Sequence, residues 1–306
     1  VIRPGWTGAQ VIFNFGQYCA KDLGYKKIII VGQDYSYPWD QAAGFIRGFL
    51  ENGGEKVERI WHPVEAVDFS SIMAKLMNMS KEYDAVLNNS GGAQVVGFFK
   101  QWKQFGLDKV YPQILGQANV PIVSMLSELG DSALGVYSSL HYYDGNPSEA
   151  NRKFRESFKK KYGHYPDVIA VQGYDAVHVA FKAMKAINGQ VDDPKKFIAA
   201  LRQVKMSVDE SPRGPFYFDK YANPVQNIYI KKVVKIDGRL MNEAVKTYEE
   251  VSQFGPYADM ADKYMAAPAT TRDYPPGDKT SYFKEIEKYF GKDYVAKLKK
   301  TTGWVD

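Results

Sequence analysis

The chain has 306 residues, of which 45% are apolar and 25% charged, so it can form one large domain or, more readily, two of ordinary size. Its mean hydropathy of −0.39 and the lack of any apolar run near about 18 residues exclude a membrane-spanning helix. The net charge of +5 comes from 40 basic and 35 acidic residues spread along the chain, which argues against a nucleic-acid-binding protein.

The first half of the chain alternates short apolar runs with amphipathic helices. Strands are predicted at 27–31, 56–61, 84–87, 113–116 and 133–140. Helices are predicted at 7–23, 39–52, 93–105 and 121–129, together with one that carries Ile72, Met73, Leu76 and Met77. Strands that alternate with helices in this way predict an α/β fold with a parallel, doubly wound sheet.

The segment 26–52 indicates where such a sheet would bind a ligand. Its β-branched run at 28–32 has the character of a parallel strand that is buried on both faces. Tyr35, Tyr37 and Trp39 follow at the carboxyl end of this strand, in the crevice where open α/β sheets bind small molecules. An ordinary loop with incidental aromatic residues explains this segment alone equally well.

After residue 144 the pattern changes. Helices are predicted at 148–162, 167–187 and 194–204, a hairpin at 214–234 with its turn at 221–224, a proline-rich linker after 251 and a final helix at 282–300. The first two of these helices carry apolar faces, with Phe154, Phe158, Val171 and Phe181, but this half offers no parallel strands for them to cover. We therefore expect sheet-forming sequence to be missing ahead of Val1, or to come from another polypeptide.

Side chains suited to catalysis or metal binding are scattered. His62, His141, His164 and His178 form no metal-ligand spacing, and Cys19 stands alone on an apolar helix face. No Gly-x-Ser-x-Gly elbow or complete phosphate-binding loop occurs. We therefore expect no catalysis, no cofactor and no metal, and we expect Cys19 to be a core residue.

Six sequence phrases stand in a fixed order along residues 1 to about 237. They are KKIIIVGQDYSYPWDQAAGF, VDFSSIMAKL, GFFKQWKQFGL, ALGVYSSLHYYDGNP, PDVIAVQGYDA and GPFYFDKYANPVQNIYIKKV. In this order they resemble the leucine/isoleucine/valine-binding family of type I periplasmic binding proteins, which are the solute receptors of branched-chain amino-acid-type ABC importers. The resemblance implies a two-lobed α/β fold whose parallel, doubly wound sheets are joined by crossover hinge strands.

The resemblance also implies how the chain divides. Residues 6–140 with 228–237 correspond to the Rossmann-like second lobe, residues 143–226 to the later part of the first lobe, and residues 251–306 to a C-terminal extension. The chain would cross between lobes near 1–6, 139–143 and 227–230. The opening βα units of the first lobe, which supply its sheet and half of the ligand contacts, have no counterpart in this sequence.

Several positions match ligand-lining positions of the family. Tyr37 matches an aromatic residue that covers the ligand, and the loop from Ser90 to Gly92 matches another lining loop. Gly91 and Ala118 are departures, because amino-acid-binding members carry an aromatic residue at the first position and an ammonium-pairing acid at the second. An unpaired buried ammonium costs about 3–5 kcal/mol, a large share of the roughly 8 kcal/mol of a micromolar complex. A standard amino acid is therefore disfavoured, unless Asp34 or an acid of the missing lobe substitutes.

We accordingly expect one ligand cleft that combines aromatic rings with neutral hydrogen-bonding groups. Stacking surface would come from Tyr35, Tyr37 and Trp39, and hydrogen bonds from Ser36, Ser90, Gln117 and Asn119. The remaining candidates are Gly91, Ala118, and His141 and Tyr143 at the second crossover.

The function that this resemblance implies is solute capture for an ABC importer, outside the cytoplasm, by a membrane-anchored or free protein. Hinge closure would trap the solute, and the closed form would dock on the membrane permease. An aromatic or aliphatic carboxylate, or an amide, is favoured as the solute. The alternatives are an α/β enzyme such as a nucleotide-sugar transferase, and an amide-sensing regulator on the same fold.

Overall fold

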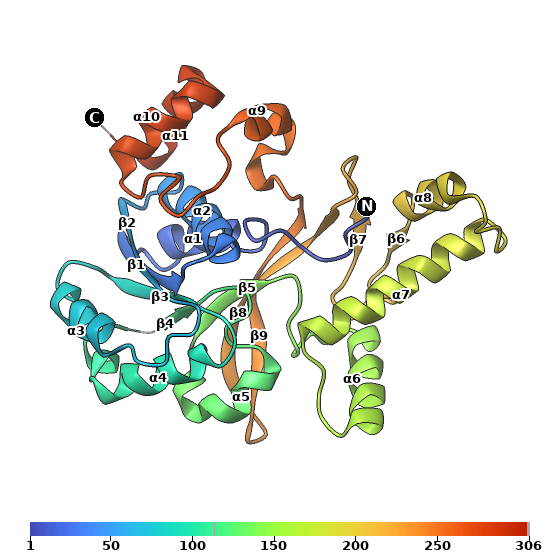
Figure 1. Ribbon diagram of the computed structural model, residues 1–306, viewed down its shortest axis with the longest axis horizontal. Coiled ribbons are helices and arrows are strands. Elements are labelled where there is room, and N and C mark those ends of the chain that lie inside the picture. Colours follow the sequence, from blue (N-terminus) through green and yellow to red (C-terminus); the bar gives the residue numbers. More distant parts are fainter. Residues whose placement is uncertain (113, 305–306) are drawn as a thin grey trace.

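A computed structural model describes residues 1–112 and 114–304 (Figure 1). Within these residues one mixed sheet has the strand order β2-β1-β3-β4-β5-β8-β7-β6, and β9 pairs with β8. The strands are β1 (Lys27–Gln33), β2 (Lys56–His62), β3 (Ala85–Asn89), β4 (Ile114–Gly116), β5 (Tyr137–Leu140), β6 (Lys205–Met206), β7 (Phe216–Phe218), β8 (Pro224–Ile236) and β9 (Arg239–Val251). The predicted strand 113–116 starts at a residue outside the described ones, and its remaining residues form β4.

The α-helices cover about half of the described residues outside the strands. They are α1 (Phe13–Lys21), α2 (Ser36–Leu50), α3 (Ser70–Met79), α4 (Gln94–Gln104), α5 (Val123–Leu129), α6 (Glu149–Tyr162), α7 (Val168–Ala186), α8 (Pro194–Arg202), α9 (Ala261–Ala266), α10 (Lys279–Phe290) and α11 (Lys292–Thr302). Short 3₁₀ turns occur at η1 (Leu107–Lys109), η2 (Gly130–Ala133) and η3 (Gly255–Met260). None of the helices in the described ranges is both long enough and apolar enough to cross a membrane.

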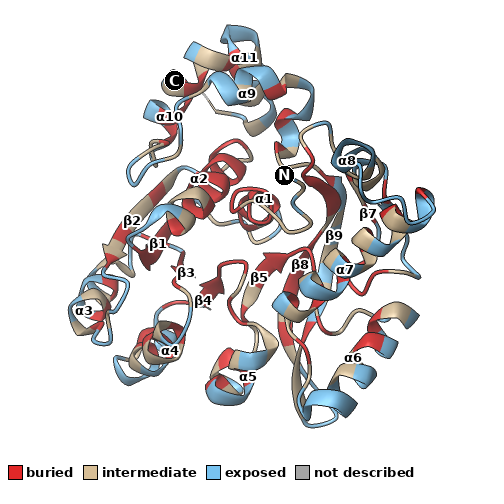
Figure 2. Cartoon of the chain, turned by 45° about the vertical axis from the view of Figure 1, so that its right-hand side comes forward, coloured by how far each residue is buried: buried red, intermediate tan, exposed pale blue. Residues whose placement is uncertain are grey.

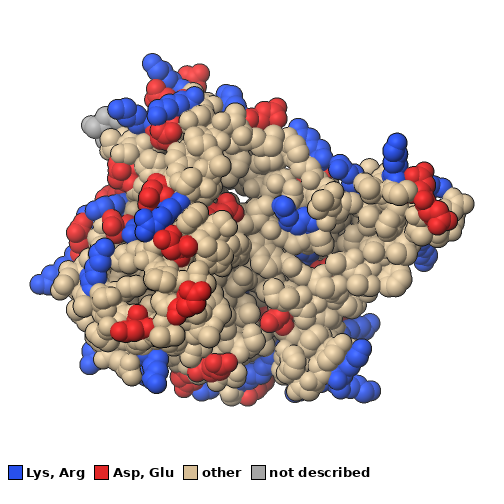
Figure 3. All heavy atoms as spheres, viewed as in Figure 1, with Lys and Arg blue, Asp and Glu red and all other residues tan. Residues whose placement is uncertain are grey.

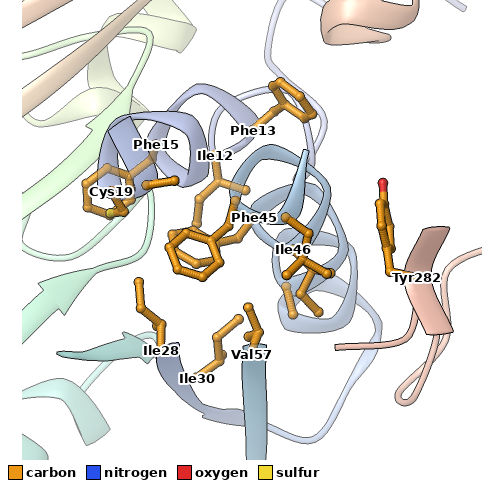
Figure 4. Packing of buried hydrophobic residues seen from close by; sticks show 14 of the residues in the cluster. Ile12, Phe13, Phe15, Cys19, Ile28, Ile30, Phe45, Ile46, Val57 and Tyr282 are labelled. Carbon is orange, nitrogen blue, oxygen red and sulfur yellow. The ribbon is translucent and has the colours of Figure 1, made fainter. Parts of the chain in front are cut away.

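The strand β1 shows why the parallel part of the sheet is doubly wound. Its alternate side chains point to opposite faces, so Ile28 and Ile30 join one core while Ile29 and Val31 join another. The first core is covered by α1 and α2 and contains the fully buried Cys19 (Figure 4). The second is covered by α3, α4 and α5, whose outer surfaces face solvent in Figure 2. The predicted parallel, doubly wound arrangement is confirmed for β1 to β5.

Two glycines are required by close backbone contacts. A Cβ atom on Gly48 of α2 would lie 1.9 Å from the carbonyl oxygen of Phe13, so only glycine lets α1 and α2 cross at this distance. A Cβ atom on Gly116 would lie 1.8 Å from the carbonyl oxygen of Val120. The second contact folds the segment after β4 tightly back on the strand end.

The long strand β8 connects the two halves of the molecule. Tyr229 to Lys232 pair with β5, whereas Pro224 to Gln226 pair with β7, so one strand serves both groups. The β7–β8 pair confirms the predicted hairpin. The strand β9, which the sequence analysis did not predict, pairs antiparallel with β8 along almost the whole length of β9. Register shifts interrupt that pairing between Gln226 and Ile228 and between Ile230 and Lys231.

The C-terminal segment 252–304 packs on the outer side of α1 and α2 (Figure 1). Tyr257, Tyr282 and Phe290 share one apolar core with the residues of these two helices, and Figure 4 places Tyr282 beside α2. The single helix predicted at 282–300 is wrong. The helix is interrupted at Gly291, whose φ of 90° and ψ of 165° are accessible to glycine but not to most residues. Two helices therefore form instead of one.

The helix α7 is covered on one side only. Val171, Val179 and Ala183 are buried against neighbouring elements. Ile169, Val177 and Phe181 are 58%, 52% and 63% exposed. The prediction that Phe154 and Val171 lack cover is wrong, because both are buried in an apolar cluster with Val11 and Leu140. Phe181 is the one of the predicted residues that lies exposed on this face of α7.

Candidate ligand-binding site

Three segments that follow parallel strands meet at one edge of the sheet. Residues 34–39 follow β1 and include the first turn of α2, residues 90–92 follow β3, and residues 117–120 follow β4. Because β1, β3 and β4 are consecutive parallel neighbours, their carboxyl ends lie side by side. This arrangement brings most of the predicted ligand residues together.

The hydroxyl group of Tyr37 is the centre of a hydrogen-bond network. It accepts hydrogen bonds from Nε1 of Trp6 at 3.0 Å, Nε2 of Gln41 at 3.0 Å and Nδ2 of Asn119 at 3.4 Å. Burial raises the pKa of Tyr37 to about 12, so the phenol stays neutral at physiological pH and keeps its own proton for donation. Three segments that are distant in sequence are therefore held around one aromatic ring.

The loops after β3 and β4 bind each other directly. Nε2 of Gln117 donates to the carbonyl oxygen of Ser90 at 3.0 Å, and Oε1 of Gln117 accepts from the amide of Asn119 at 2.8 Å. The Ser90 hydroxyl is buried and lies 2.8 Å from Nε2 of His62. The Gly91 amide donates to Oε1 of Gln33 at 3.0 Å. These polar groups fix the shape of the loops through contacts within the protein.

The aromatic turn after β1 is held from outside. Nε1 of Trp39 donates to Oδ1 of Asp34 at 3.0 Å. Arg272 of the C-terminal segment places its Nε 3.1 Å from both oxygens of the same carboxylate. Tyr35 and Ser36 are exposed at the rim of this turn. Trp39 is therefore tied to a cation of the C-terminal segment through Asp34.

His141 lies behind this network. Its ring packs on that of Trp6, with the ring centroids 4.8 Å apart, and is 1% exposed. Burial, together with the nearby cations Arg213 and Lys231, holds the pKa of His141 well below its usual range, so the ring is neutral and offers one donor and one acceptor. Neither ring nitrogen has a hydrogen-bond partner among the described residues.

Other buried polar atoms nearby also lack partners within the described chain. They include Oδ1 of Asn119 and Nε2 of Gln172, which packs against Gly5 next to Trp6. A buried polar atom without a partner costs about 1–3 kcal/mol. A polar solute that satisfied these atoms would therefore gain affinity here.

The structure places two predicted residues away from the Tyr37 network. Ala118 is fully buried in an apolar cluster with Val11 and Leu140, so its methyl group is a packing contact. Tyr143 packs edge-on against Tyr229, with ring centroids 4.8 Å apart. Their predicted contacts with a ligand stay predictions.

Sequence reasoning missed two members of the site. Trp6 lies in the first predicted crossover, and its aromatic ring was the available signal. Lys231 is 1% exposed and donates to the carbonyl oxygen of Pro121 at 3.2 Å, beneath the loop after β4. Burial lowers the pKa of Lys231 to about 8, which still leaves it mostly charged at pH 7. The alternation of residues in this strand predicts that a lysine faces solvent, so the local sequence contains no indication that Lys231 is buried.

Comparison with known proteins assigns this fold to one family. Residues 1–239 match the sequence profile of the family described as periplasmic binding protein, and the chain belongs to this family. The resemblance noted from the sequence and the type I periplasmic-binding fold are thereby confirmed.

Individual relatives agree with this assignment. A Leu/Ile/Val-binding protein homolog 6 of Brucella melitensis is 34% identical over 254 residues, which are 82% of this chain and 64% of the relative. The chain thus spans less than two thirds of the length of the curated relatives that it matches.

Two solved structures match the fold closely. An ABC transporter solute-binding protein of Rhodopseudomonas palustris BisB5, in complex with 3,4-dihydroxybenzoic acid, has a TM-score of 0.75 and 35% identity, covering 82% of this chain and 68% of that one. One from Rhodopseudomonas palustris HaA2, in complex with p-hydroxybenzoic acid, has a TM-score of 0.75 and 27% identity, covering 84% and 69%.

Proposed function

We propose that this chain is the solute-binding part of an ABC importer and that its solute is a small aromatic carboxylate. The observation that carries the proposal is the Trp6–Tyr37–Asn119 network, which surrounds an aromatic ring with neutral hydrogen-bonding groups. The buried cation Lys231 favours an anionic solute over a cationic one. Two relatives with this fold hold hydroxylated benzoic acids.

The acids near the network are poorly placed to bind an amino-acid ammonium group. Asp34, the substitute that the sequence left open, is engaged by Arg272 and Trp39. Oδ2 of Asp40 accepts the amide proton of Ala9 at 3.0 Å. A ligand ammonium would therefore have to compete for both carboxylates, which supports the preference for a carboxylate over leucine.

The proposed mechanism is closure of two lobes around the solute. Residues 6–140 with 228–237 would form one lobe and residues 143–226 part of the other, with residues 251–306 as an extension on the first. The chain would work outside the cytoplasm, deliver its solute to a membrane permease and perform no catalysis, as the family and its solute-binding relatives suggest.

We also propose that strand-bearing polypeptide of the lobe containing α7 covers the exposed face of that helix. Ile169, Val177 and Phe181 form an apolar stripe at helical spacing, and such a stripe normally packs on another element.

Calorimetry tests the proposed function. The protein is titrated with 4-hydroxybenzoate, 3,4-dihydroxybenzoate, benzoate and leucine under one buffer condition. We expect the aromatic acids to bind at micromolar or lower concentrations and leucine to bind far more weakly. Submicromolar leucine binding without aromatic-acid binding would refute the proposed solute class. An amide-sensing role would instead give preferential binding of benzamide over benzoate.

A further inference from the structure

A cavity of about 680 Å³ lies away from the Tyr37 network. It is bounded by α5, the turn between α6 and α7, and the tip of the β8–β9 hairpin. Its volume falls within the range of about 300–1,000 Å³ that is usual for small-molecule sites. Leu126, Phe158 and Leu240 give it an apolar wall, and Lys159 and Arg239 line it with positive charge. The Tyr37 network, in contrast, lies at the carboxyl ends of β1, β3 and β4.

Three cations surround one phenol at this cavity. The centroid of the Tyr165 ring is 3.5 Å from the guanidinium carbon of Arg239, 4.4 Å from Nζ of Lys159 and 4.9 Å from the guanidinium carbon of Arg155. Nζ of Lys159 also donates to the Tyr165 hydroxyl at 3.2 Å. Figure 3 shows Lys and Arg side chains gathered over α6 on this side of the molecule. Burial and the neighbouring Arg155 lower the pKa of Arg239, as expected where like charges are crowded.

Asp131 and Asp167 also line the cavity, and both carboxylates have partners there. Asp131 binds Nζ of Lys235 at 3.0 Å, and Oδ1 of Asp167 caps α7 by accepting the amide protons of Ile169 and Ala170. The nearest approach of Asp144 to Arg239 is 4.0 Å.

The guanidinium groups keep unused donors. Nη2 of Arg239 is buried, has no hydrogen-bond partner in the described residues and lies 4.0 Å from Oδ2 of Asp144. Nε of Arg155 also lacks a described partner, but Arg155 does not line the cavity. A guanidinium that stacks on an aromatic ring leaves the N–H groups at its edge free for in-plane hydrogen bonds to a carboxylate. The positive charge of this cluster is therefore matched incompletely by the protein itself.

We propose that this cavity is a second ligand site, independent of the Tyr37 site, that takes an amphipathic organic carboxylate. The carboxylate head lies between Arg239 and Lys159, and the apolar body packs on Phe158, Leu126 and Leu240. Because the cavity is bounded by α5 on one side and the α6–α7 turn on the other, an occupant contacts both parts of the chain. This inference does not depend on the solute proposed for the Tyr37 site.

Octanoate is the probe for this site, and octylamine is its matched probe of opposite charge. Isothermal titration of the whole chain is expected to show saturable binding of octanoate and none of octylamine. Arg239→Ala and Lys159→Gln are each expected to weaken octanoate binding by about tenfold or more, because each removes a charge-assisted contact. Lys232→Ala is the control, since Lys232 is on β8 beside the Tyr137 ring and does not line the cavity.

Two further measurements separate this site from the Tyr37 site. Tyr37→Ala should leave octanoate binding intact, and Arg239→Ala should leave 4-hydroxybenzoate binding intact. Circular dichroism identifies any variant that fails to fold. If Arg239→Ala fails to fold, Lys159→Gln alone tests the proposal. The proposal is overturned if octanoate does not bind saturably, if Lys159→Gln binds it as the unmodified chain does, or if Tyr37→Ala abolishes its binding.

Discussion

Tyr294 of α11 donates a hydrogen bond of 3.0 Å to Oε2 of Glu51 at the end of α2. The other carboxylate oxygen accepts the hydroxyl groups of Tyr257 and Tyr282, so three phenols from the C-terminal segment converge on one buried acid. Arg47, one turn earlier on α2, is also buried and lies over the ring of Tyr264. The helix that begins beside the candidate ligand turn is thus anchored at its far end by the C-terminal segment.

Glu51→Ala should lower the free energy of unfolding by about 2–4 kcal/mol, because three hydroxyl groups lose their shared acceptor and the buried Arg47 loses a nearby opposite charge. Urea denaturation followed by circular dichroism measures the change. Glu249→Ala, on the exposed side of β9, serves as the control and should change stability by less than about 0.5 kcal/mol. Equal stability of the two variants would show that the phenol cluster does not stabilise the fold.

Tyr37→Ala should weaken binding of 4-hydroxybenzoate by about tenfold or more, since a ring buried on a ligand contributes roughly 1.5–3 kcal/mol. Tyr37→Phe keeps the ring and removes the hydroxyl group, so its affinity for 4-hydroxybenzoate should lie between those of the unmodified chain and Tyr37→Ala. Calorimetry on both variants is compared with Tyr162→Ala, whose ring is 53% exposed on α6. Unchanged affinity in Tyr37→Ala would remove this residue from the site.

Arg272→Ala should weaken aromatic-acid binding by no more than about fivefold, because Arg272 and Asp34 are half and one third exposed and such pairs contribute about 0–1 kcal/mol. The effect should shrink further in 0.5 M salt, which screens exposed charges. Arg202→Ala on the exposed side of α8 is the matched control. A loss of a hundredfold or more would mean that Arg272 contacts the solute itself.

His141 should make stability depend on pH. In the unfolded chain its pKa is about 6.5, whereas burial holds the pKa of His141 well below that value in the folded state. Below pH 6.5 the unfolded chain therefore binds a proton that the folded chain does not, and stability falls by up to roughly 1.4 kcal/mol per pH unit. Urea titrations at pH 7.5 and 5.5 should show a smaller loss in His141→Asn. Identical losses in both proteins would contradict this reading.

The alternation of apolar runs with helices was enough to predict the parallel sheet, because β1, β3 and β4 are buried on both faces and the helices that cover them have one apolar side. The break at Gly291 was not recognised, since the helical spacing of apolar residues continues across it and only the backbone conformation differs. β9 was missed because its exposed edge is rich in polar residues, and its stability comes from pairing with β8.

The candidate site was predicted in part for the same reason. Residues just after strands, such as Tyr37 and Asn119, follow from the topology of any parallel sheet. Trp6 and Lys231 enter the site only through the crossing segments, whose meeting point depends on the tertiary fold. A buried lysine leaves no pattern in its own strand.

The two register shifts in the β8–β9 ribbon have a mechanical consequence. They flank residues 227–230, the segment where the sequence places the third crossing between lobes. A bulge lowers the resistance of a strand pair to bending and twisting at one point. Motion of the proposed lobes would then bend a hydrogen-bonded strand pair at that point. The strand pair would restore one preferred angle between the lobes, whereas a flexible linker would allow a broad range of angles.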